Sequence, residues 1–168
     1  AYTIGRAFGH TVKSKLTSHT IVSGYDGRLT SPSLHKALCK GLKDSGVKVI
    51  NIGMGPTPMT YFAHYHFEAD AAVMLTGSHN PSEYNGFKMV FNKHSFFAED
   101  IQSLQKLLDN NELELAEGQI INQDITEEYI ERDLLNISLN RKLKVAWDPG
   151  NVAMGKVTRK ITEQLINS

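Results

Sequence analysis

Cysteine, net charge and long apolar runs are all scarce in this sequence of 168 residues, and each shortage excludes a class of protein. The one cysteine, Cys39, cannot build a disulfide framework or a cysteine-based zinc site, and we predict a small buried side chain there. The 18 Lys and Arg residues are balanced by 18 Asp and Glu residues, so no excess of positive charge is present to bind nucleic acid or an anionic membrane. No uncharged apolar run approaches the roughly 18 residues of a membrane span, and the first residues lack the pattern of a signal peptide. We therefore expect a cytoplasmic protein with neither nucleic acid nor a membrane as its partner.

The sequence does contain what a packed core requires. Hydrophobic residues make up 40% of the chain and charged residues 21%, a composition that is too apolar for intrinsic disorder. At roughly 150 residues per domain, the length predicts one domain with a remainder.

Helical and strand patterns alternate along the first half of the chain. An apolar stripe at helical spacing predicts an initial helix, and its members are Ile4, Ala7, Phe8 and Val12. Short apolar or β-branched runs predict three strands, at residues 20–25, 47–52 and 71–75. Two helices are predicted between the strands, because Ser31 before Pro32 and Thr57 before Pro58 are typical of helix starts. This order predicts parallel strands joined by right-handed crossovers.

The second half begins with a strand at residues 87–91, which follows its predecessor too closely for a crossover and is therefore predicted to be antiparallel. The remaining predictions are a helix at 99–108, a polar linker at 110–123, a helix at 126–135, a strand at 143–147, a turn at 148–151 and a helix at 157–166. Asp124 is the expected N-cap of the helix at 126–135, with Glu127 as its capping-box partner.

These elements predict a three-layer α/β/α sandwich with a mostly parallel mixed sheet. We assign residues 1–110 to this domain and residues 111–142 to a linker and helix. A single strand and helix cannot bury their own apolar surface, so residues 143–168 are expected to be the truncated start of a second α/β domain.

The loop after residue 75 is the predicted ligand site, because such sheets bind ligands beyond the carboxyl ends of their strands. Residues 76–81 read Thr-Gly-Ser-His-Asn-Pro, and residues 84–88 read Tyr-Asn-Gly-Phe-Lys. Gly77 lets the backbone approach a ligand closely, and Ser78 is expected to be presented as a nucleophile or phosphoryl carrier. His79 is a candidate proton donor, and Lys88 can neutralise phosphate or move a proton. The residue types alone also fit a plain connection between strands with a solvated Ser78.

The loop closely resembles the phosphoserine loop of the α-D-phosphohexomutases, in the form typical of bacterial phosphomannomutase/phosphoglucomutase. Three other segments resemble the same family: residues 24–28 (Gly-Tyr-Asp-Gly-Arg), 53–58 (Gly-Met-Gly-Pro-Thr-Pro) and 148–151 (Asp-Pro-Gly-Asn). The resemblance implies an isomerase that moves a phosphoryl group reversibly between the 1- and 6-positions of a hexose phosphate, through a sugar 1,6-bisphosphate. Ser78 is implied as the phosphoserine, with His79 and Lys88 as the other catalytic residues.

We expect five residues to support the loop or the substrate, namely Thr76, Gly77, Asn80, Asn85 and Arg28. The resemblance places Asn80 at an active-site position of the family. It also implies Mg²⁺, held in the family between the serine phosphate and three alternating aspartates. Ser78, through its phosphate, is the one metal ligand expected from this part of the fold.

The sequence departs from the family pattern in four respects, the first being that the family's tyrosine- and arginine-containing loop before the first helix has no counterpart. Tyr25 stands where the family usually has arginine, and we expect this to alter packing rather than chemistry. No Asp-x-Asp-x-Asp run occurs in the 168 residues. The sugar-selecting and phosphate-binding loops of the family's later domains also have no counterpart.

We therefore expect this chain to lack mutase turnover by itself and to need the family's domains 2–4, from the same protein or from a separate chain, as its partner. The alternative is a non-catalytic phosphoacceptor or binding module, or a remnant of a mutase. The hexose phosphate stays open, with glucosamine phosphate as an alternative to mannose or glucose phosphate.

Two smaller candidates complete the sequence analysis. His64 and His66 are two residues apart and cannot share one helix face, so a zinc site is not expected there. Arg28 fits either a structural anchor for the first turn or an exposed side chain.

Overall fold

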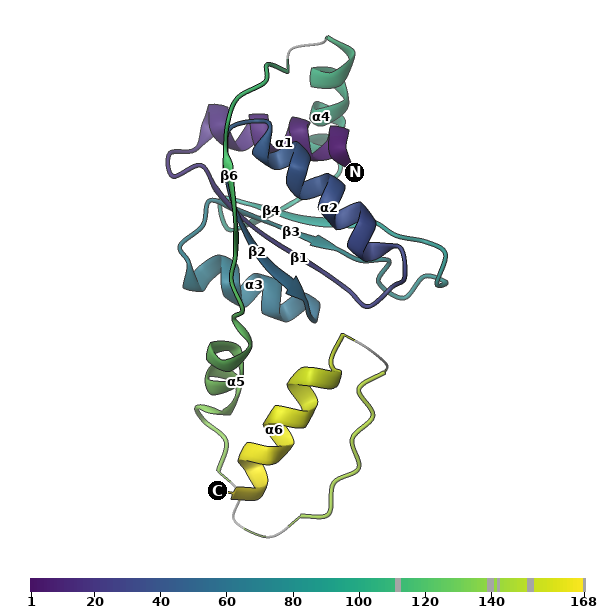
Figure 1. Ribbon diagram of the computed structural model, residues 1–168, viewed down its shortest axis with the longest axis vertical. Coiled ribbons are helices and arrows are strands. Elements are labelled where there is room, and N and C mark those ends of the chain that lie inside the picture. The colour runs from purple at the N-terminus through teal and green to yellow at the C-terminus, as the bar shows by residue number, and fades with distance from the viewer. Residues whose placement is uncertain (111–112, 139–140, 142, 151–152, 168) are drawn as a thin grey trace.

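A six-stranded mixed sheet in the order β5-β4-β3-β1-β2-β6 forms the centre of the molecule (Figure 1). The computed structural model describes residues 1–110, 113–138, 141, 143–150 and 153–167. Its strands are β1 (Thr20–Tyr25), β2 (Lys48–Met54), β3 (Ala71–Leu75), β4 (Phe87–Phe91), β5 (His94–Phe96) and β6 (Gln119–Asn122). Its helices are α1 (Tyr2–Lys15), α2 (Ser31–Lys43), α3 (Thr57–His66), α4 (Glu99–Asp109), α5 (Thr126–Leu134) and α6 (Gly155–Asn167).

The central strands run parallel, as the crossover pattern predicts. β1 pairs in parallel with both β2 and β3, and β4 pairs antiparallel with β3, which confirms the prediction for residues 87–91. All five residues of β3 are buried, because helices cover the sheet on both faces.

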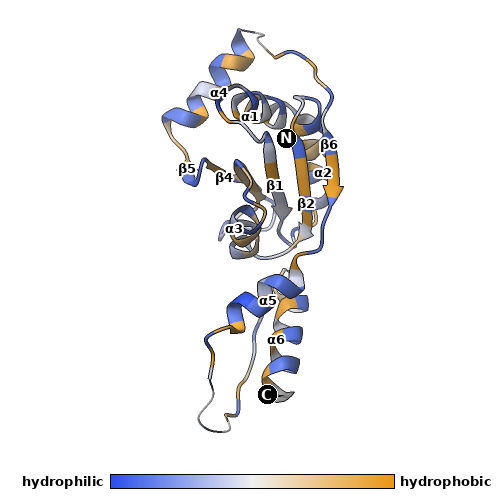
Figure 2. Ribbon diagram, turned by 90° about the vertical axis from the view of Figure 1, so that its left-hand side faces the viewer, coloured by the Kyte–Doolittle hydropathy of each residue, from blue (hydrophilic) through white to orange (hydrophobic). Residues whose placement is uncertain are grey.

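Two hydrophobic clusters pack against the two faces of the sheet. Helices α1, α2 and α4 supply one cluster, with Phe8, Leu38 and Leu104 among its buried members. Helices α3 and α5 and the start of α6 supply the other, with Met59 and Ile130 among its members. Figure 2 shows the same arrangement from the side, with the sheet between its helices. The structure is therefore the predicted α/β/α sandwich.

Helices α1 and α2 approach each other closely enough for their backbones to touch. A Cβ atom placed on Gly41 would lie 2.1 Å from the carbonyl oxygen of Tyr2. Glycine is therefore needed at this crossing, and it lets two helices cover one face of the sheet side by side.

The predicted linker at 110–123 is wrong in one part, because residues 119–122 form β6. This strand pairs in parallel with the edge strand β2. Its four residues are all exposed, so they carry none of the apolar alternation that identifies a strand in a sequence. The short strand β5 was not predicted either, and it pairs with β4.

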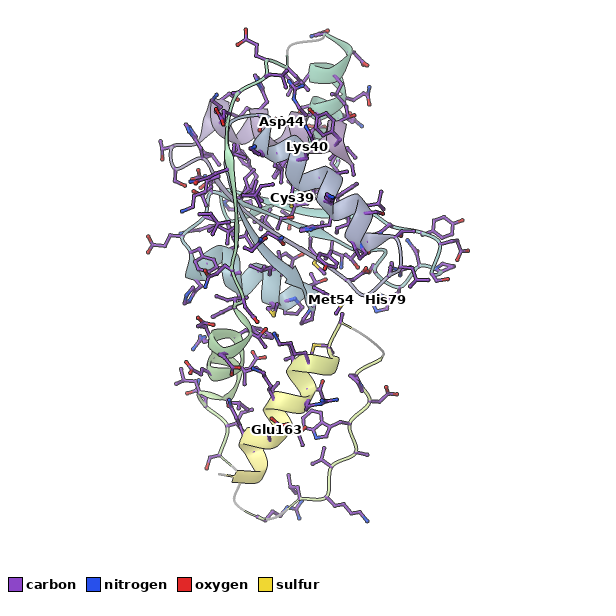
Figure 3. All side chains as sticks on the ribbon, in the orientation of Figure 1. Cys39, Lys40, Asp44, Met54, His79 and Glu163 are labelled. Atoms are coloured by element: carbon purple, nitrogen blue, oxygen red, sulfur yellow. The ribbon has the colours of Figure 1, made fainter. Side chains whose placement is uncertain are left out.

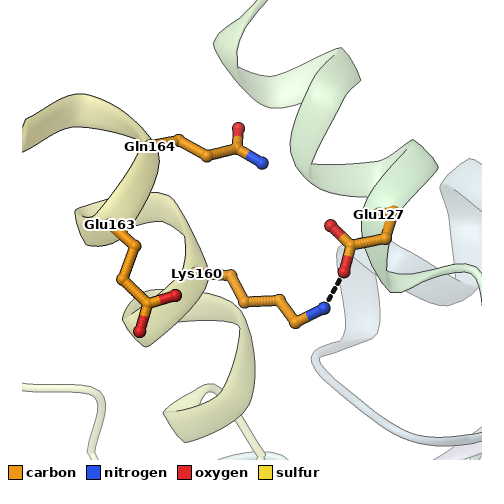
Figure 4. Close-up of a pocket in the computed structure, with 4 residues that line it drawn as sticks. All are labelled: Glu127, Lys160, Glu163 and Gln164. Carbon is orange, nitrogen blue, oxygen red and sulfur yellow. Dashed lines mark ion pairs between the residues drawn. The ribbon is translucent and has the colours of Figure 1, made fainter. Parts of the chain in front are cut away.

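The predicted helix starts are nearly right, but the capping residues differ. α2 and α3 begin at Ser31 and Thr57 themselves, and neither helix has a side-chain cap. Asp124 does accept a hydrogen bond from the backbone N–H of Thr126 at 3.0 Å. Glu127 is not its capping-box partner, because its carboxylate instead forms an ion pair with Lys160 of α6 (Figure 4).

The C-terminal segment packs α6 against α5, below the sheet in Figure 1. The predicted strand at 143–147 is wrong, because residues 143–149 contain no strand. A strand needs a paired neighbour, and Leu143, Val145 and Trp147 each remain about half exposed. The predicted turn is described as far as Gly150, whose N–H bonds the Asp148 side chain at 2.9 Å, whereas Asn151 lies outside the described residues. Within the described part of the chain, no helix is both long and apolar enough to cross a membrane.

Candidate active-site loop

The loops after β1 and β3 lie side by side at the carboxyl edge of the sheet. β1 lies between β2 and β3: the chain that follows β1 leads to β2 on one side, and the chain that follows β3 leads to β4 on the other side. Such a topological switch point is where open α/β sheets bind ligands. The backbone N–H of Asp26 donates to the carbonyl of Leu75 at 3.0 Å and ties the two loops together at their start.

Asp26 organises the first of these loops. One carboxylate oxygen accepts from the Ser31 hydroxyl at 2.6 Å and from the Arg28 N–H at 3.2 Å. The other accepts from Arg28 Nε at 3.1 Å and from the Gly77 N–H at 3.3 Å. Burial raises the pKa of Asp26, but the hydrogen bonds from Ser31, Thr76, Arg28 and Gly77 outweigh it and hold the pKa below its usual value. Asp26 is therefore an ionised structural centre.

Arg28 connects that centre to the predicted site loop. Its Nη1 donates to the carbonyls of Pro81 at 2.5 Å and Tyr84 at 3.1 Å. Its Nη2 donates to the carbonyls of Ser78 at 3.1 Å and Asn80 at 2.8 Å. The side chain is only 14% exposed, so of the two interpretations of Arg28 the structure supports the anchor.

Gly77 makes room for this guanidinium. A Cβ atom at Gly77 would lie 2.4 Å from Arg28 Cζ and 2.6 Å from the Tyr84 carbonyl oxygen. The sequence suggested a close approach of a ligand at this position, whereas the close neighbour in the structure is Arg28. Glycine is the residue that permits this contact.

Ser78 is exposed, as the sequence predicts, and its backbone is held in the left-handed region at φ 54°. Few residues other than glycine adopt this conformation, and it persists only where the surroundings impose it. The Ser78 N–H donates to the Thr76 hydroxyl at 2.9 Å, and its carbonyl accepts from Arg28. The Ser78 hydroxyl lies 3.3 Å from Nδ1 of His79, which is also exposed (Figure 3). The loop thus presents a hydroxyl beside an imidazole.

Asn85 fixes the far end of the loop. Its amide donates to the hydroxyls of Thr30 at 3.2 Å and Ser31 at 2.9 Å, at the start of α2. Its carbonyl oxygen accepts from the Gly86 N–H at 3.0 Å. Both ends of the loop are therefore bonded to the segment that follows β1.

Lys88 lies on β4 opposite Met74 of β3. Directly paired residues share a face of the sheet. The Met74 sulfur accepts a hydrogen bond from the Thr60 hydroxyl of α3, so Lys88 is on the same face of the sheet as α3. The lysine is exposed and forms no ion pair or hydrogen bond within the described part of the chain, so its ammonium is available to a ligand.

Comparison with known proteins identifies the family. Residues 1–114 match the family model described as phosphoglucomutase/phosphomannomutase, alpha/beta/alpha domain I. The chain belongs to the phosphoglucomutase/phosphomannomutase family. A phosphomannomutase/phosphoglucomutase of Pseudomonas putida is 43% identical over 166 residues, and a phosphoglucomutase of Neisseria meningitidis is 37% identical over 169 residues. A crystal structure of a phosphoglucomutase/phosphomannomutase family protein from Burkholderia thailandensis matches with a TM-score of 0.88 and 37% identity.

The match covers nearly all of this chain but about a third of each relative. The chain is covered to 98%, 99% and 98% in these three comparisons, and the relatives to 35%, 36% and 37%. The part of the family that this chain matches therefore includes domain I and the loop described above.

The donors near Ser78 do not complete a Mg²⁺ site of the kind that the family resemblance implies. No group of three or more His, Cys, Asp or Glu residues able to hold a metal is found where the structure describes the chain. The nearby carboxylate, Asp26, already accepts hydrogen bonds on both oxygens. Ser78 itself offers the metal one hydroxyl oxygen, and an octahedral ion needs more oxygen ligands than that.

Sequence reasoning missed Asp26 as the residue that connects the two loops of this chain, and it missed the contribution of Ser31. A usable signal was present, because Asp26 follows β1 and the site loop follows β3, the strand that pairs with β1. Parallel neighbouring strands bring the loops at their carboxyl ends together.

The remaining sequence candidates are structural. Cys39 is 4% exposed, which confirms the predicted small buried residue, and burial raises the pKa of its thiol to about 11. Tyr25, the departure from the family pattern, packs its ring 4.7 Å from that of His35. His64 is buried and belongs to no metal cluster that the described residues form.

Proposed function

We propose that this chain is the phosphoserine-bearing part of a phosphohexomutase and that Ser78 carries the phosphoryl group. The observation that supports this most is the exposed Ser78 at φ 54° on a loop whose carbonyls are bound by Arg28, a largely covered side chain. A nucleophile that is held in place and open to solvent meets the main demand of phosphoryl transfer, which is positioning.

The proposed cycle consists of two phosphoryl transfers, the first from Ser78 to the sugar and the second from the sugar back to Ser78. The bond between phosphorus and Ser78 Oγ breaks while a bond forms to the free sugar hydroxyl, whose proton is released, and Ser78 Oγ regains a proton. The product is a sugar 1,6-bisphosphate. After the sugar reorients, Ser78 Oγ loses its proton and takes the other phosphoryl group, and the sugar oxygen takes a proton. The net result is a phosphoryl group moved between the 1- and 6-positions.

His79 and Lys88 are the proposed proton-handling and charge-neutralising groups. His79 Nδ1 lies 3.3 Å from Ser78 Oγ, which is slightly beyond good hydrogen-bond distance but within reach of a small rotation. Lys88 supplies a free ammonium that can neutralise phosphate or move a proton. Thr76, Asn80 and Asn85 support the loop, and the sugar, its selectivity and the other Mg²⁺ ligands belong to domains 2–4 of the family.

Labelled phosphoryl transfer tests this proposal. The chain is completed with domains 2–4 of the Pseudomonas putida relative, because the sugar and the other Mg²⁺ ligands are assigned to them. It is incubated with Mg²⁺ and α-D-glucose 1,6-bisphosphate that carries labelled phosphorus, and label bound to protein is counted. We expect the wild-type chain to acquire label, Ser78→Ala to acquire none, and Ser82→Ala to match the wild type. Ser82 is the matched control because it is an exposed serine of the same loop. Equal labelling of Ser78→Ala and the wild type, or no label on the wild type at saturating bisphosphate, contradicts the proposal.

A further inference from the structure

All five N–H groups of the Arg28 guanidinium are used at the site loop and its support. Nε donates to Asp26, Nη1 donates to Pro81 and Tyr84, and Nη2 donates to Ser78 and Asn80. A guanidinium carries five N–H donors in one rigid plane, so this side chain has none left over. With every donor bonded, the Arg28 guanidinium is held in one orientation relative to the loop.

The four loop carbonyls come from both limbs of the loop. Ser78 and Asn80 lie on the limb that leaves β3, and Tyr84 lies on the limb that returns toward β4. Within the loop the backbone bonds are local, from Asn80 to Gly77 and from Tyr84 to Pro81. One bond at its base joins the two limbs, from the Thr76 N–H to the Gly86 carbonyl at 2.9 Å. Among the described residues, Arg28 alone bonds the backbone of both Ser78 and Tyr84.

We propose that Arg28 is a positioning residue that sets the backbone of Ser78 for phosphoryl transfer, with Asp26 orienting the guanidinium. This inference rests on the proposed role of Ser78. By occupying Nε, Asp26 leaves both terminal nitrogens of Arg28 directed at the loop. Binding by a cation also reduces the repulsion that four partially negative carbonyl oxygens exert on a phosphoryl anion at Ser78.

Arg28→Lys is the informative variant, because lysine keeps the charge and carries three donors on a single atom. Arg132→Lys on α5 is the matched control, since Arg132 is exposed and far along the chain from the loop. Two quantities are measured on each protein. The first is amide hydrogen exchange across the loop and the strands. The second, measured on the chain completed with the same domains 2–4, is the rate of labelling from α-D-glucose 1,6-bisphosphate at a series of concentrations.

We expect exchange in residues 78–86 of Arg28→Lys to accelerate by about tenfold or more, with the amides of β1 and β3 unchanged. The maximal labelling rate should fall on the order of a hundredfold, while the half-saturating bisphosphate concentration stays near the wild-type value. Arg132→Lys should match the wild type in both measurements.

Loop exchange at the wild-type rate in Arg28→Lys overturns the inference. Equal acceleration of loop and strand amides also overturns it, because the residue would then serve global stability alone. If Arg28→Lys does not fold, Asp26→Asn receives the same two measurements and is expected to show the same loop-confined change. Failure of the wild-type chain to acquire label would defeat the proposed function of Ser78, whereas the exchange data would still decide whether Arg28 orders the loop.

Discussion

At the scale of single residues, the contact between Gly77 and Arg28 explains why a glycine precedes the exposed serine. The guanidinium lies where a side chain at residue 77 would begin. The glycine therefore leaves room for the Arg28 side chain that binds the loop, and the next residue, Ser78, is exposed to solvent.

Gly77→Ala should destabilise the protein and impair the loop. The added Cβ would lie 2.4 Å from Arg28 Cζ, and such overpacking costs about 1–3 kcal/mol. Urea denaturation measures the change in the free energy of unfolding. Gly155→Ala is the control, because a Cβ at Gly155 meets no atom within 4 Å. Equal stability of the two variants would contradict the described contact.

His35 makes stability depend on pH. Its ring lies 2.9 Å from the Ser23 hydroxyl, and burial lowers its pKa from 6.5 to about 4 despite an opposing hydrogen bond from the ring to the Ser23 backbone. Between these two values the unfolded chain binds a proton that the folded chain does not, so stability falls as the pH is lowered from about 6.5 toward 4. The loss attributable to His35 is at most about 3 kcal/mol.

Urea denaturation at a series of pH values checks this prediction. His35→Gln should show a shallower decline across the same range than the wild type. Burial also lowers the pKa of His64, so some decline should remain in the variant. An unchanged slope in His35→Gln would show that His35 is protonated as readily in the folded protein as in the unfolded chain.

At the scale of elements, the close crossing of α1 and α2 determines how the helices cover the sheet. Gly41→Ala should lower the free energy of unfolding by about 1–3 kcal/mol or more, because the new Cβ would meet backbone rather than a flexible side chain. Gly155→Ala again provides the matched control, and denaturant midpoints are the measurement. A Gly41→Ala protein as stable as the wild type would mean that the two backbones are not in contact.

Elements with a strong apolar pattern could be predicted from the sequence, and elements defined by pairing could not. β3 is recognisable because all of its residues are buried, whereas β6 is recognisable only once β2 is beside it. Residues 143–149 show the reverse case, since an apolar pattern without a described partner strand does not form a strand.

The candidate site also contains residues that the sequence predicts and residues that only the fold reveals. Ser78 could be chosen from its loop, because chemistry and turn residues coincide there in one short stretch. Asp26 could not, and Arg28 could be named only as a candidate support without its partners. Their roles depend on contacts between residues about 50 positions apart in the chain. Only the folded sheet brings these positions together.

At the scale of the whole molecule, the chain holds domain I of a family whose named members are about three times longer than the matched segment, which covers 35–37% of them. The loop that carries the proposed chemistry is anchored within this domain, by Asp26 and Arg28. The proposed division is that this part accepts and returns a phosphoryl group, while the family's other domains bind the sugar. The isolated chain is therefore expected to lack mutase turnover.

The most direct measurement of the central claim is to locate the phosphoryl group by tandem mass spectrometry. The chain, completed with domains 2–4 of the Pseudomonas putida relative, is treated with α-D-glucose 1,6-bisphosphate and Mg²⁺ and digested, and the modified residue is read from the fragment ions. The account predicts modification of Ser78 alone, with Ser82 in the same loop unmodified. A phosphoryl group on any other residue, or an unmodified Ser78 at saturating bisphosphate, would contradict it.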